Sequence, residues 1–444
     1  MKNIHFIGIG GTGMSGLANI CLEKGCHVTG SDLKESDTVK YLENKGAVIT
    51  IGHNGDLLPK TSEVVVYSTA VKKDNPEIKA ANQSGILIWH RSELLKWLTE
   101  EKTTYGIAGA HGKTTTTTMV AEIFNKAETH PTVAAGGKLI FHGANGIYDS
   151  EGEILIAELD ESDGSFLKMK VDSAIITNID DDHLDYYRTK EKIIEAFKEF
   201  IGNVKSNIII NGEDETLRVL VKDKDNVITF GFENCDYTIE DINVQNYRNT
   251  GKVYYKGEYI GTINIPLPGV HNLQNALGAL VLARLKGIPD EVIFKSLDTF
   301  QGVGRRFEVV GQKNGITIVD DYAHHPNEID ALLTGAKSFG YKRVIAVFQP
   351  HRYTRTNQLF DEFVAVLKNA DLVIVSPIYS AGETPIEGIS SEKLVESIGS
   401  SGVYKENFSE TVQYLIENAM AEDLILTIGA GDICDVGRLS LSAL

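Results

Sequence analysis

A glycine-rich stretch between an apolar run and a helical pattern constrains this chain more than any other feature. Residues 106–115 read GIAGAHGKTT, directly after a short apolar run. Glycines allow backbone N–H groups to surround phosphate oxygens, and the start of the following helix adds a favourable dipole. Lys113 can neutralise charge on the β- and γ-phosphates, and Thr114 can offer its hydroxyl to Mg2+. The order strand, loop, helix therefore predicts a P-loop in a parallel α/β sheet. The nucleotide-binding residues predicted from this loop are Gly109, Ala110, His111, Gly112, Lys113, Thr114 and Thr115.

Apolar runs alternate with helical patterns along the chain, which favours parallel sheets with crossover helices. At 444 residues the chain is also too long for one hydrophobic core, since cores stop growing beyond roughly 250 to 300 residues. The strand-like runs are 4–9, 28–30, 48–51 and 64–68, then 105–108, 154–158, 173–177 and 207–210, and finally 316–319, 344–348, 372–375 and 424–427. The alternating pattern over 237–265, with a hairpin-like stretch at 252–261, predicts an antiparallel excursion before a helix near 272–285. We predict three α/β domains, 1–100, 101–307 and 308–444.

The composition excludes several classes of function. The 43 Lys plus Arg residues against 61 Asp plus Glu give a net charge of -18, whereas sequence-independent nucleic-acid binding needs a positive surface. No stretch of the sequence reaches the roughly 20 unbroken apolar residues of a membrane helix. The four cysteines are scattered, without the paired spacing of zinc sites or the density of a disulfide scaffold. We therefore expect a cytoplasmic protein that binds neither nucleic acid nor membranes.

A second glycine cluster follows the first apolar run. Residues 8–13 read GIGGTG, and Asp32 lies at about the distance expected of a ribose-binding acid in a dinucleotide site. The pattern indicates a tight turn that brings a phosphorylated ligand to a helix N-terminus. NAD and any other nucleotide with a diphosphate would satisfy it, and these residues alone do not separate the two.

Two acidic clusters follow strand-like runs in the middle of the chain. Residues 157–163 read AELDESD, and residues 178–185 read NIDDDHLD. Carboxylates crowded at the end of a strand are costly without a cation, and hard oxygen ligands opposite a P-loop suit a Mg2+-nucleotide site. Glu158 or a neighbour is therefore a candidate metal ligand, and His183 joins it because of the acids around it.

Polar side chains also gather in four later loops. They occur at 271–275, 305–308 and 320–326, where a loop meets regular structure, and at 349–355, after a strand-like run. The last of these contains Arg352 and Arg355, which suit a carboxylate or phosphate because a guanidinium donates forked hydrogen bonds. Each loop alone is compatible with an idle solvated turn, but their succession in one chain favours function.

Together these motifs resemble the Mur ligases over nearly all 444 residues. The residues that carry the resemblance are IGGTGMSG at 9–16, GAHGKTT at 109–115, DESD at 160–163, HNLQN at 271–275 and DYAHHP at 321–326. In combination these motifs are specific to the family. The first and last point to the member that adds L-alanine to UDP-N-acetylmuramate, rather than to those that add later peptide residues.

The resemblance implies an N-terminal Rossmann-like domain for the UDP moiety, a central P-loop domain for ATP and a C-terminal Rossmann-like domain for the incoming amino acid. It thereby assigns the first glycine loop to the UDP diphosphate instead of NAD. The implied UDP-substrate residues are Gly10, Gly11, Thr12, Gly13, Met14, Ser15, Asp32, Ser68, Thr69, Asp160, Glu161 and Ser162. Further ATP residues are Asn272, Asn275, Arg305, Arg306, Asp320 and Asp321, and Mg2+ ligands are Thr114, Glu158 and His183. The amino-acid residues are Tyr322, His324, Arg352 and Arg355, and the catalytic residues are Lys113, His183, Asn272, Arg306 and His324.

The reaction that this resemblance implies needs no protein nucleophile. ATP phosphorylates the muramoyl carboxylate, and the amine of L-alanine attacks the resulting acyl phosphate. Lys113 and Mg2+ would screen the repulsion between the two anions, and His324 is a candidate base for the alanine ammonium. The expected partners are these small molecules, in a monomer or homodimer.

One position departs from the family pattern. Several sister Mur ligases carry a carbamylated lysine beyond the region matched here by 183–185, but this chain has Phe197 at the aligned position and Lys198 one place away. The alanine-adding branch generally lacks that lysine. The departure leaves open whether a second metal binds and what takes the place of the carbamate.

Three alternatives remain at the level of sequence. A recycling ligase that attaches a whole tripeptide to UDP-N-acetylmuramate shares much of the motif set, although Tyr322 and the YSTA stretch at 67–70 favour the alanine enzyme. An NAD-dependent oxidoreductase would explain residues 8–13 and Asp32 but leaves the P-loop idle. A P-loop binding or regulatory protein would leave Arg352 and Arg355 unexplained.

Overall fold

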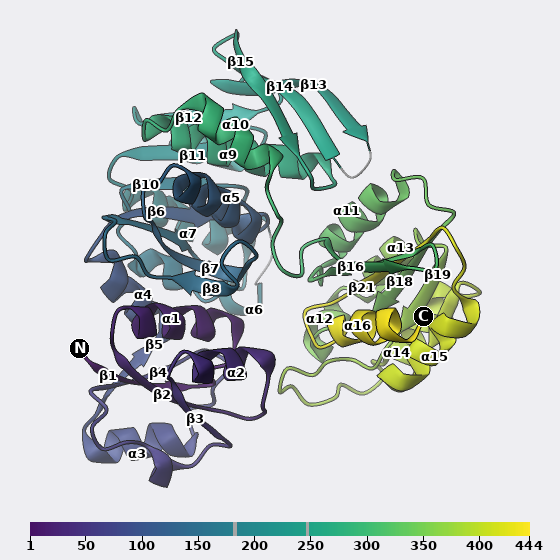
Figure 1. The fold of residues 1–444 in the computed structure, drawn as a ribbon, viewed down its shortest axis with the longest axis horizontal. Coiled ribbons are helices and arrows are strands. Elements are labelled where there is room, and N and C mark those ends of the chain that lie inside the picture. Colours follow the sequence, from purple (N-terminus) through teal and green to yellow (C-terminus); the bar gives the residue numbers. More distant parts are fainter. Residues whose placement is uncertain (181–183, 246–247) are drawn as a thin grey trace. The chain divides into compact units, whose positions relative to one another are not determined.

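The computed structural model describes residues 1–180, 184–245 and 248–444. Within these ranges the strands form three sheets (Figure 1). From the N-terminus to the C-terminus, the sheets have five, ten and six strands. The chain packs as two compact units. The first comprises residues 1–242, 250–265 and 271–301, and the second comprises residues 302–444 with the short segments 266–270 and the described part of 243–249. The first unit contains the first sheet and most of the second, and the second unit contains the third.

The first sheet is wholly parallel, in the order β3-β2-β1-β4-β5. Its strands are β1 (Asn3–Ile7), β2 (His27–Asp32), β3 (Val48–Ile51), β4 (Val64–Tyr67) and β5 (Leu87–His90), and its helices are α1 (Thr12–Glu23), α2 (Asp37–Asn44), η1 (Gly55–Leu57), α3 (Pro76–Ser84) and α4 (Arg91–Thr99). Buried apolar residues of α1, α2 and α4 belong to the core on one face, and those of α3, with Leu58 directly after η1, belong to the core on the other. This is the predicted Rossmann-like arrangement, with β5 as a strand that the sequence did not indicate.

The second sheet has the order β15-β14-β13-β12-β11-β10-β6-β9-β7-β8. Its strands are β6 (Thr103–Ala108), β7 (Thr132–Leu139), β8 (Ala144–Ile147), β9 (Ile154–Glu158), β10 (Ser173–Ile176), β11 (Asn207–Asn211), β12 (Val227–Gly231), β13 (Tyr237–Gln245), β14 (Arg248–Tyr255) and β15 (Glu258–Ile265). The helices are α5 (Lys113–Lys126), η2 (Ser165–Lys168), α6 (Leu184–Tyr187), α7 (Lys190–Gly202), α8 (Glu215–Val221), α9 (Val270–Leu285) and α10 (Asp290–Asp298). The P-loop strand β6 lies between β9 and β10, parallel to both.

Both ends of this sheet carry hairpins. The predicted one joins β14 to β15 through Lys256 and Gly257, which both have positive φ, as a two-residue hairpin turn requires. The other, antiparallel pair β7 and β8, was not predicted. Strand β8 has only four residues, both strands contain glycine, and both lack the strict apolar alternation that identifies a strand in sequence.

The third sheet has the order β16-β17-β21-β18-β19-β20, with only β16 antiparallel to its neighbour. Its strands are β16 (Glu308–Lys313), β17 (Ile316–Asp321), β18 (Arg343–Phe348), β19 (Leu372–Val375), β20 (Gly402–Tyr404) and β21 (Asp423–Ile428), and its helices are α11 (Pro326–Lys337), α12 (Tyr353–Gln358), α13 (Phe360–Leu367), α14 (Ser391–Ile398), α15 (Phe408–Asn418) and α16 (Cys434–Ala443). The cores on its two faces include α11, α13 and α14 on one side and α15 and α16 on the other.

Two sequence expectations are resolved by burial. Phe197, at the position aligned with the carbamylated lysine, is 1% exposed and its ring lies 5.2 Å from that of Phe166. It is a core residue. Asp320 and Asp321, expected in a loop after a strand, are instead the last residues of β17, and both are buried. Both residues pair with β21, and both carboxylates have hydrogen-bond partners, described below. None of the helices that the structure describes is long and apolar enough to cross a membrane.

Candidate functional site

The loop between β6 and α5 has the backbone of a phosphate-binding turn. Gly109 and Gly112 have φ values of +134° and +81°, which L side chains rarely adopt. A Cβ at Gly109 would lie 2.1 Å from Thr177 Oγ1, so this turn also packs too closely for any other residue. Helix α5 begins at Lys113 without a side-chain cap, which leaves its first N–H groups for a ligand. The predicted P-loop is therefore formed.

Lys113 is the most densely paired cation of this loop. Its Nζ donates to the carbonyls of Gly109 (2.5 Å) and Ala110 (3.0 Å) and lies 2.9 and 2.8 Å from the two carboxylate oxygens of Glu161. Burial alone would lower the pKa of Lys113, but Glu161 and then Asp160 outweigh it, and the pKa is raised. The ammonium is therefore a fixed positive charge, held by groups that phosphate oxygens could replace.

Glu158 ends β9 beside the P-loop. Its Oε1 accepts a hydrogen bond from Thr114 Oγ1 (2.9 Å) and its Oε2 accepts one from the backbone N–H of Gly136 (2.6 Å). A Cβ at Gly136 would meet Glu158 Oε1 at 2.4 Å, so the glycine makes room for the carboxylate. Burial raises the pKa of Glu158. A half-buried acid whose charge is costly, next to a P-loop hydroxyl, is suited to receive a cation.

The segment after β10 supports the P-loop from the other side. Asn178 accepts the backbone N–H of His111 through Oδ1 (2.8 Å) and that of Ala110 through its own carbonyl (3.1 Å). His111 Nε2 lies 3.2 Å from Asp180 Oδ2. The sequence placed Asn178 and Asp180 in an acidic cluster but assigned them no role. The candidate ligand His183 falls outside the described residues.

Helix α9 brings Asn272 and Asn275 to the same loop. Asn275 Nδ2 donates to Asn272 Oδ1 (3.1 Å), and a Cβ at Gly112 would lie 2.5 Å from Asn275 Oδ1. Both asparagines are largely buried near the start of α9. Two side chains about 160 positions beyond the P-loop glycines therefore contact the loop or its neighbour, as the resemblance implied for ATP residues. Thr115 is buried on the first turn of α5.

The first glycine loop is anchored by Asp32. The backbone N–H of Gly10 donates to Asp32 Oδ2 (2.8 Å), and α1 begins after Gly11 without a side-chain cap. Asp32 therefore holds the turn itself, in addition to the substrate role that the resemblance implies. In the same loop Ser15 Oγ donates to the Thr12 carbonyl (3.2 Å), Met14 is buried, and a Cβ at Gly13 would lie 3.1 Å from Arg91 Nη1.

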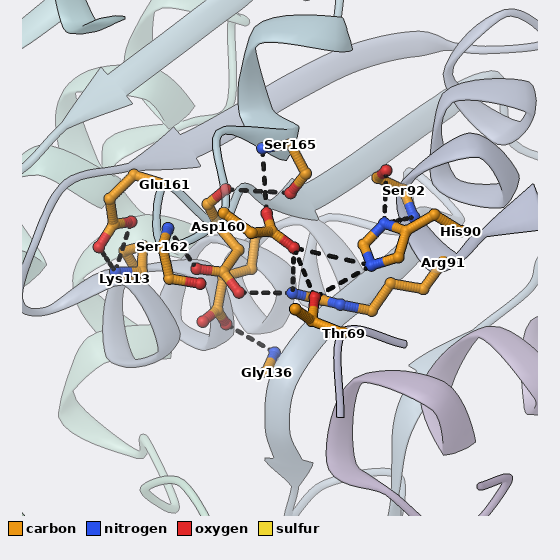
Figure 2. A network of polar contacts seen from close by, with 12 residues as sticks. Thr69, His90, Arg91, Ser92, Lys113, Gly136, Asp160, Glu161, Ser162 and Ser165 are labelled. Atoms are coloured by element: carbon orange, nitrogen blue, oxygen red, sulfur yellow. Dashed lines mark hydrogen bonds and ion pairs between the residues drawn. The ribbon is translucent and has the colours of Figure 1, made fainter. Parts of the chain in front are cut away.

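Figure 2 shows how the acidic loop after β9 reaches from Lys113 to the first domain. Arg91 Nη2 lies 2.5 Å from Asp160 Oδ2, and Thr69 Oγ1 donates to Asp163 Oδ2 (3.0 Å). Asp160 Oδ1 also accepts the backbone N–H of Ser162 (3.0 Å). Burial alone would raise the pKa of Asp160, but Arg91 and then Lys113 lower it. The loop thus pairs one cation of each domain.

Arg91 and His90 were missed in the sequence because they sit at the end of β5, a strand that had no clear pattern. His90 Nε2 lies 3.1 Å from Thr69 Oγ1 and 3.7 Å from Asp163 Oδ2. The backbone carbonyl of the predicted residue Ser68 accepts the N–H of Val71 (2.9 Å). A basic residue directly after a short apolar run was the available signal for Arg91.

Arg305, just before the third sheet, makes its side-chain hydrogen bonds within its own domain. It donates from Nε to Asp320 Oδ2 (3.0 Å), from Nη1 to the Gly431 carbonyl (3.0 Å) and from Nη2 to the Gly429 carbonyl (2.7 Å). Its guanidinium lies 4.9 Å from the centre of the Tyr322 ring, and that of Arg306 lies 5.4 Å from it. Arg305 therefore fixes the loop after β21, whatever further role it has.

Asp321 organises the backbone around Tyr322. It accepts the N–H groups of Phe307 (2.7 Å) and Ala323 (2.8 Å), and burial raises its pKa to about 6. His324 follows, with Nδ1 3.0 Å from the Tyr322 carbonyl and 3.4 Å from Glu328 Oε2. Burial lowers the pKa of His324 to about 4, so its imidazole is neutral near pH 7.

A second histidine, His351, stands close to His324. The two ring centres are 6.1 Å apart, and Arg355 Nη1 lies 3.5 Å from His351 Nδ1. Burial and then His324 lower the pKa of His351 to about 3. The ring of Tyr379, which follows β19, stacks on His351 at 5.4 Å with an interplanar angle of 9°. Neither His351 nor Tyr379 was a predicted site residue.

Arg352 is positioned by an acid that the sequence did not single out. Its Nε donates to Glu383 Oε1 (2.8 Å), and Glu383 also accepts the N–H of Thr354 (3.0 Å) and its hydroxyl (2.7 Å). Arg352 has a φ of +75°, a strained value for a non-glycine residue. Of the predicted amino-acid residues, Tyr322 and His324 thus lie in the loop after β17, Arg352 lies in the loop after β18, and Arg355 lies in the helix α12 that follows it.

Comparison with known proteins gives matches along nearly the whole chain. Family models described as "Mur ligase family, catalytic domain", "Mur ligase middle domain" and "Mur ligase, glutamate ligase domain" match residues 3–103, 107–283 and 305–431. Together they cover far more than half of the chain.

Individual relatives are similar over full length. A UDP-N-acetylmuramate--L-alanine ligase from Pelotomaculum thermopropionicum is 44% identical, with 98% of this chain and 96% of the relative aligned. One from Desulforamulus reducens is 42% identical at the same coverage. The crystal structure of the UDP-N-acetylmuramate-alanine ligase from Thermotoga maritima matches with a TM-score of 0.88 and 30% identity, covering 100% of this chain and 99% of that one. A murein peptide ligase from Psychrobacter arcticus shares the fold, with a TM-score of 0.76, 23% identity and coverage of 100% and 98%.

Proposed function

This chain belongs to the Mur ligase family, and we propose that it joins L-alanine to the carboxylate of UDP-N-acetylmuramate at the expense of ATP. The products are UDP-N-acetylmuramoyl-L-alanine, ADP and phosphate. The observation that carries the proposal is the assembly of Lys113, Thr114 and Glu158 at one edge of the central sheet, in a chain 42 to 44% identical to alanine ligases from end to end. Because the chain belongs to this family, NAD is no longer needed to explain the first glycine loop.

In the first step Lys113 stabilises charge on the phosphoryl group that passes from ATP to the muramoyl carboxylate. Two anions must approach each other, so a fixed cation lowers the barrier more than a protein nucleophile would. Phosphate oxygens take the positions that Glu161 and the loop carbonyls now occupy around Nζ. The free N–H groups at the start of α5 bind the same phosphates. Asn272, Asn275, Arg306 and Asp321 complete the proposed ATP-binding set.

Thr114 and Glu158 fit a Mg2+ ion that accompanies ATP. No cluster of three or more acidic, histidine or cysteine side chains ready for a metal exists among the described residues. Nucleotide-bound Mg2+ needs none, because it takes one or two protein ligands and completes its shell with phosphate and water oxygens. The Glu158 carboxylate, with its pKa raised by burial, gains an opposite charge there. When bound, the ion neutralises charge on the β- and γ-phosphates. His183 is the third proposed ligand.

In the second step His324 accepts the proton that the alanine ammonium must lose before it attacks the acyl phosphate. Burial lowers its pKa to about 4, so the imidazole is neutral near pH 7 and can accept a proton, with less driving force than a base whose pKa lies near 7. Arg352 and Arg355 bind the alanine carboxylate, since guanidinium groups favour forked pairing with carboxylates. Tyr322 lines the same site. The tetrahedral intermediate then collapses to the amide and phosphate.

The UDP moiety occupies the first domain in this proposal. Gly10 to Ser15 surround the diphosphate in this proposal, Asp32 holds their loop, and Ser68 and Thr69 are further proposed substrate residues. We place the domain boundaries after residues 100 and 307, and the reaction in the cytoplasm, where ATP is available and the four free cysteines stay reduced. We propose a monomer or homodimer.

The test is phosphate release from ATP and Mg2+ with UDP-N-acetylmuramate and one amino acid at a time, with the UDP product weighed by mass spectrometry. The proposal expects release that needs both co-substrates and a product heavier by one alanyl residue. Release only with L-alanyl-γ-D-glutamyl-diaminopimelate would instead identify a tripeptide ligase. ATP hydrolysis without any heavier product would contradict ligase activity altogether.

A further inference from the structure

The ring of Tyr379 lies between His351 and the loop that follows β21. On one side it stacks on the His351 imidazole at 5.4 Å, nearly coplanar at 9°. Gly431 also lies against the ring, where a Cβ would be 2.2 Å from Gln349 Oε1 and 2.8 Å from Tyr379 Cγ. The three residues come from different loops of the same sheet, so the stack exists only in the folded domain.

Backbone hydrogen bonds fix the two stacked residues relative to each other. The N–H of Tyr379 donates to the Pro350 carbonyl, and the N–H of Arg352 donates to the Tyr379 carbonyl, both at 2.8 Å. Tyr379 and His351 form a parallel bridge between loops that are otherwise irregular. The imidazole therefore has little freedom to slide along the ring beneath it.

The loop behind Tyr379 is also held in place. The carbonyls of Gly431 and Gly429 accept hydrogen bonds from Arg305, and Gln349 Nε2 donates to Asp432 Oδ1 (2.9 Å). Arg305 and Gln349 thus hold in place the loop that the Tyr379 ring contacts. The result is a rigid series in which Arg305 holds Gly431, Gly431 supports Tyr379, and Tyr379 supports His351.

On its open side His351 faces the groups assigned to the amino acid. His324 lies 6.1 Å away between ring centres, and Arg355 Nη1 lies 3.5 Å from Nδ1. An amino acid with its carboxylate on Arg355 and its amine at His324 has its Cα between them. Its side chain then points to the face of His351. This step rests on the proposed function.

We propose that Tyr379 is a positioning residue that sets the upper size limit of the amino-acid side chain, because it holds the His351 imidazole as a fixed wall beside the Cα. The wall leaves room for a methyl group and excludes longer side chains. Arg352, Arg355, His324 and Glu383 are the ionisable groups around this wall. None of them needs to change charge for the wall to act.

The test compares L-alanine with L-2-aminobutyrate, which is longer by one methylene, in the full-length protein. One methylene in a close-fitting pocket is worth about 10 to 200-fold in kcat/KM. We expect Tyr379→Leu to lower the alanine preference about tenfold, mainly through kcat/KM for aminobutyrate rising relative to alanine. Tyr379→Phe keeps the ring and should keep the preference within about twofold of the unsubstituted protein.

An equal loss for both amino acids in Tyr379→Leu, or the same change of preference in Tyr379→Phe, would contradict the positioning role. Gly431→Ala provides an independent variant that retains Tyr379. Its methyl group would crowd Gln349 Oε1 and the Tyr379 ring, which disturbs the support of His351, so the ratio of kcat/KM for L-alanine to that for L-2-aminobutyrate should change. An unchanged ratio there would also overturn the proposal, and this variant decides the matter if Tyr379→Leu does not fold.

The unsubstituted protein separates this proposal from the proposed function. If it forms no alanyl product, the function is wrong and the preference has no meaning. If it forms the alanyl product but accepts aminobutyrate equally well, ligation stands and the wall does not.

Discussion

The P-loop region of the central sheet and the histidine cluster of the third sheet differ in how their titratable side chains are arranged. Around the P-loop, charged groups are paired with one another: Lys113 with Glu161, and Arg91 with Asp160. In the histidine cluster, the two imidazoles are half-buried and neutral, and one is stacked on an aromatic ring. The first arrangement can exchange an internal anion for a phosphate. The second arrangement, the histidine cluster, keeps its aromatic rings in a fixed position.

The contrast teaches that burial has opposite uses in the two regions. Near the P-loop it raises the value of each charge–charge contact, because the surroundings screen less. In the third domain it lowers the pKa of His324 and of His351, so both imidazoles are neutral near pH 7.

The largest effect should come from removing the fixed charge at the P-loop. Lys113→Ala is expected to lower ligation by about 10^3-fold, in the range of losing one strong electrostatic donor to a transition state. Phosphate release and product mass measure it. Lys126→Ala, on the same helix but paired with Glu122, is the matched control and should stay within about twofold. Comparable activity in both variants would remove Lys113 from the chemistry.

The next effect separates the two steps of the reaction. His324→Ala should slow amide formation by about 10^2-fold or more, since a general base contributes that much, and should leave acyl-phosphate formation nearly intact. Trapping the acyl phosphate with hydroxylamine measures the first step separately. Equal slowing of both steps would show that His324 is not the base.

A smaller change should appear in the metal requirement. Glu158→Gln removes a charge beside Thr114, so the Mg2+ concentration for half-maximal activity should rise about tenfold or more. Glu122→Gln is the control, because Glu122 is also buried on the central domain with a raised pKa but pairs with Lys126. The metal assignment fails if the two variants need the same Mg2+.

The smallest effect concerns stability at acid pH. The folded-state pKa of His351, about 3, lies below the usual value near 6.5. As the pH falls, the imidazole is therefore protonated in the unfolded chain before it is protonated in the folded one. Burial of the neutral imidazole makes its full contribution to the free energy of unfolding above about pH 6.5. That contribution is lost as the pH falls toward 3, with a limiting slope of about 1.4 kcal/mol per pH unit. His351→Gln should therefore lose less stability than the unsubstituted protein between pH 7 and 5.

Thermal unfolding at the two pH values measures this difference as a few degrees in Tm. His27→Gln, at an exposed histidine, should behave like the unsubstituted protein. If His351→Gln is as acid-sensitive as the unsubstituted protein, then His351 is not the neutral buried group that distinguishes the third domain from the P-loop region.

The local motifs of both regions could be recognised before the fold was known. The P-loop, the strand ending at Glu158, the helix at Asn272 and the arginines after β18 each depend on a few neighbouring residues and on apolar runs of regular period. Those features also predicted three α/β domains and the hairpin at β14 and β15. The family resemblance then supplied the assignment of Asp32 and Tyr322, which local chemistry left open.

Only the tertiary structure decided which distant residues meet. Arg91 reaches Asp160 across 69 positions, Arg305 reaches Gly431 across 126, and Tyr379 stacks on His351 because β18 and β19 are neighbours. Such pairs follow from strand order and from loops without a period, so no local pattern announces them. The burial of Phe197, Asp320 and Asp321 belongs to the same class. The sequence by itself determined the chemistry of the groups, and packing decided their partners, their charge states and the shape between them.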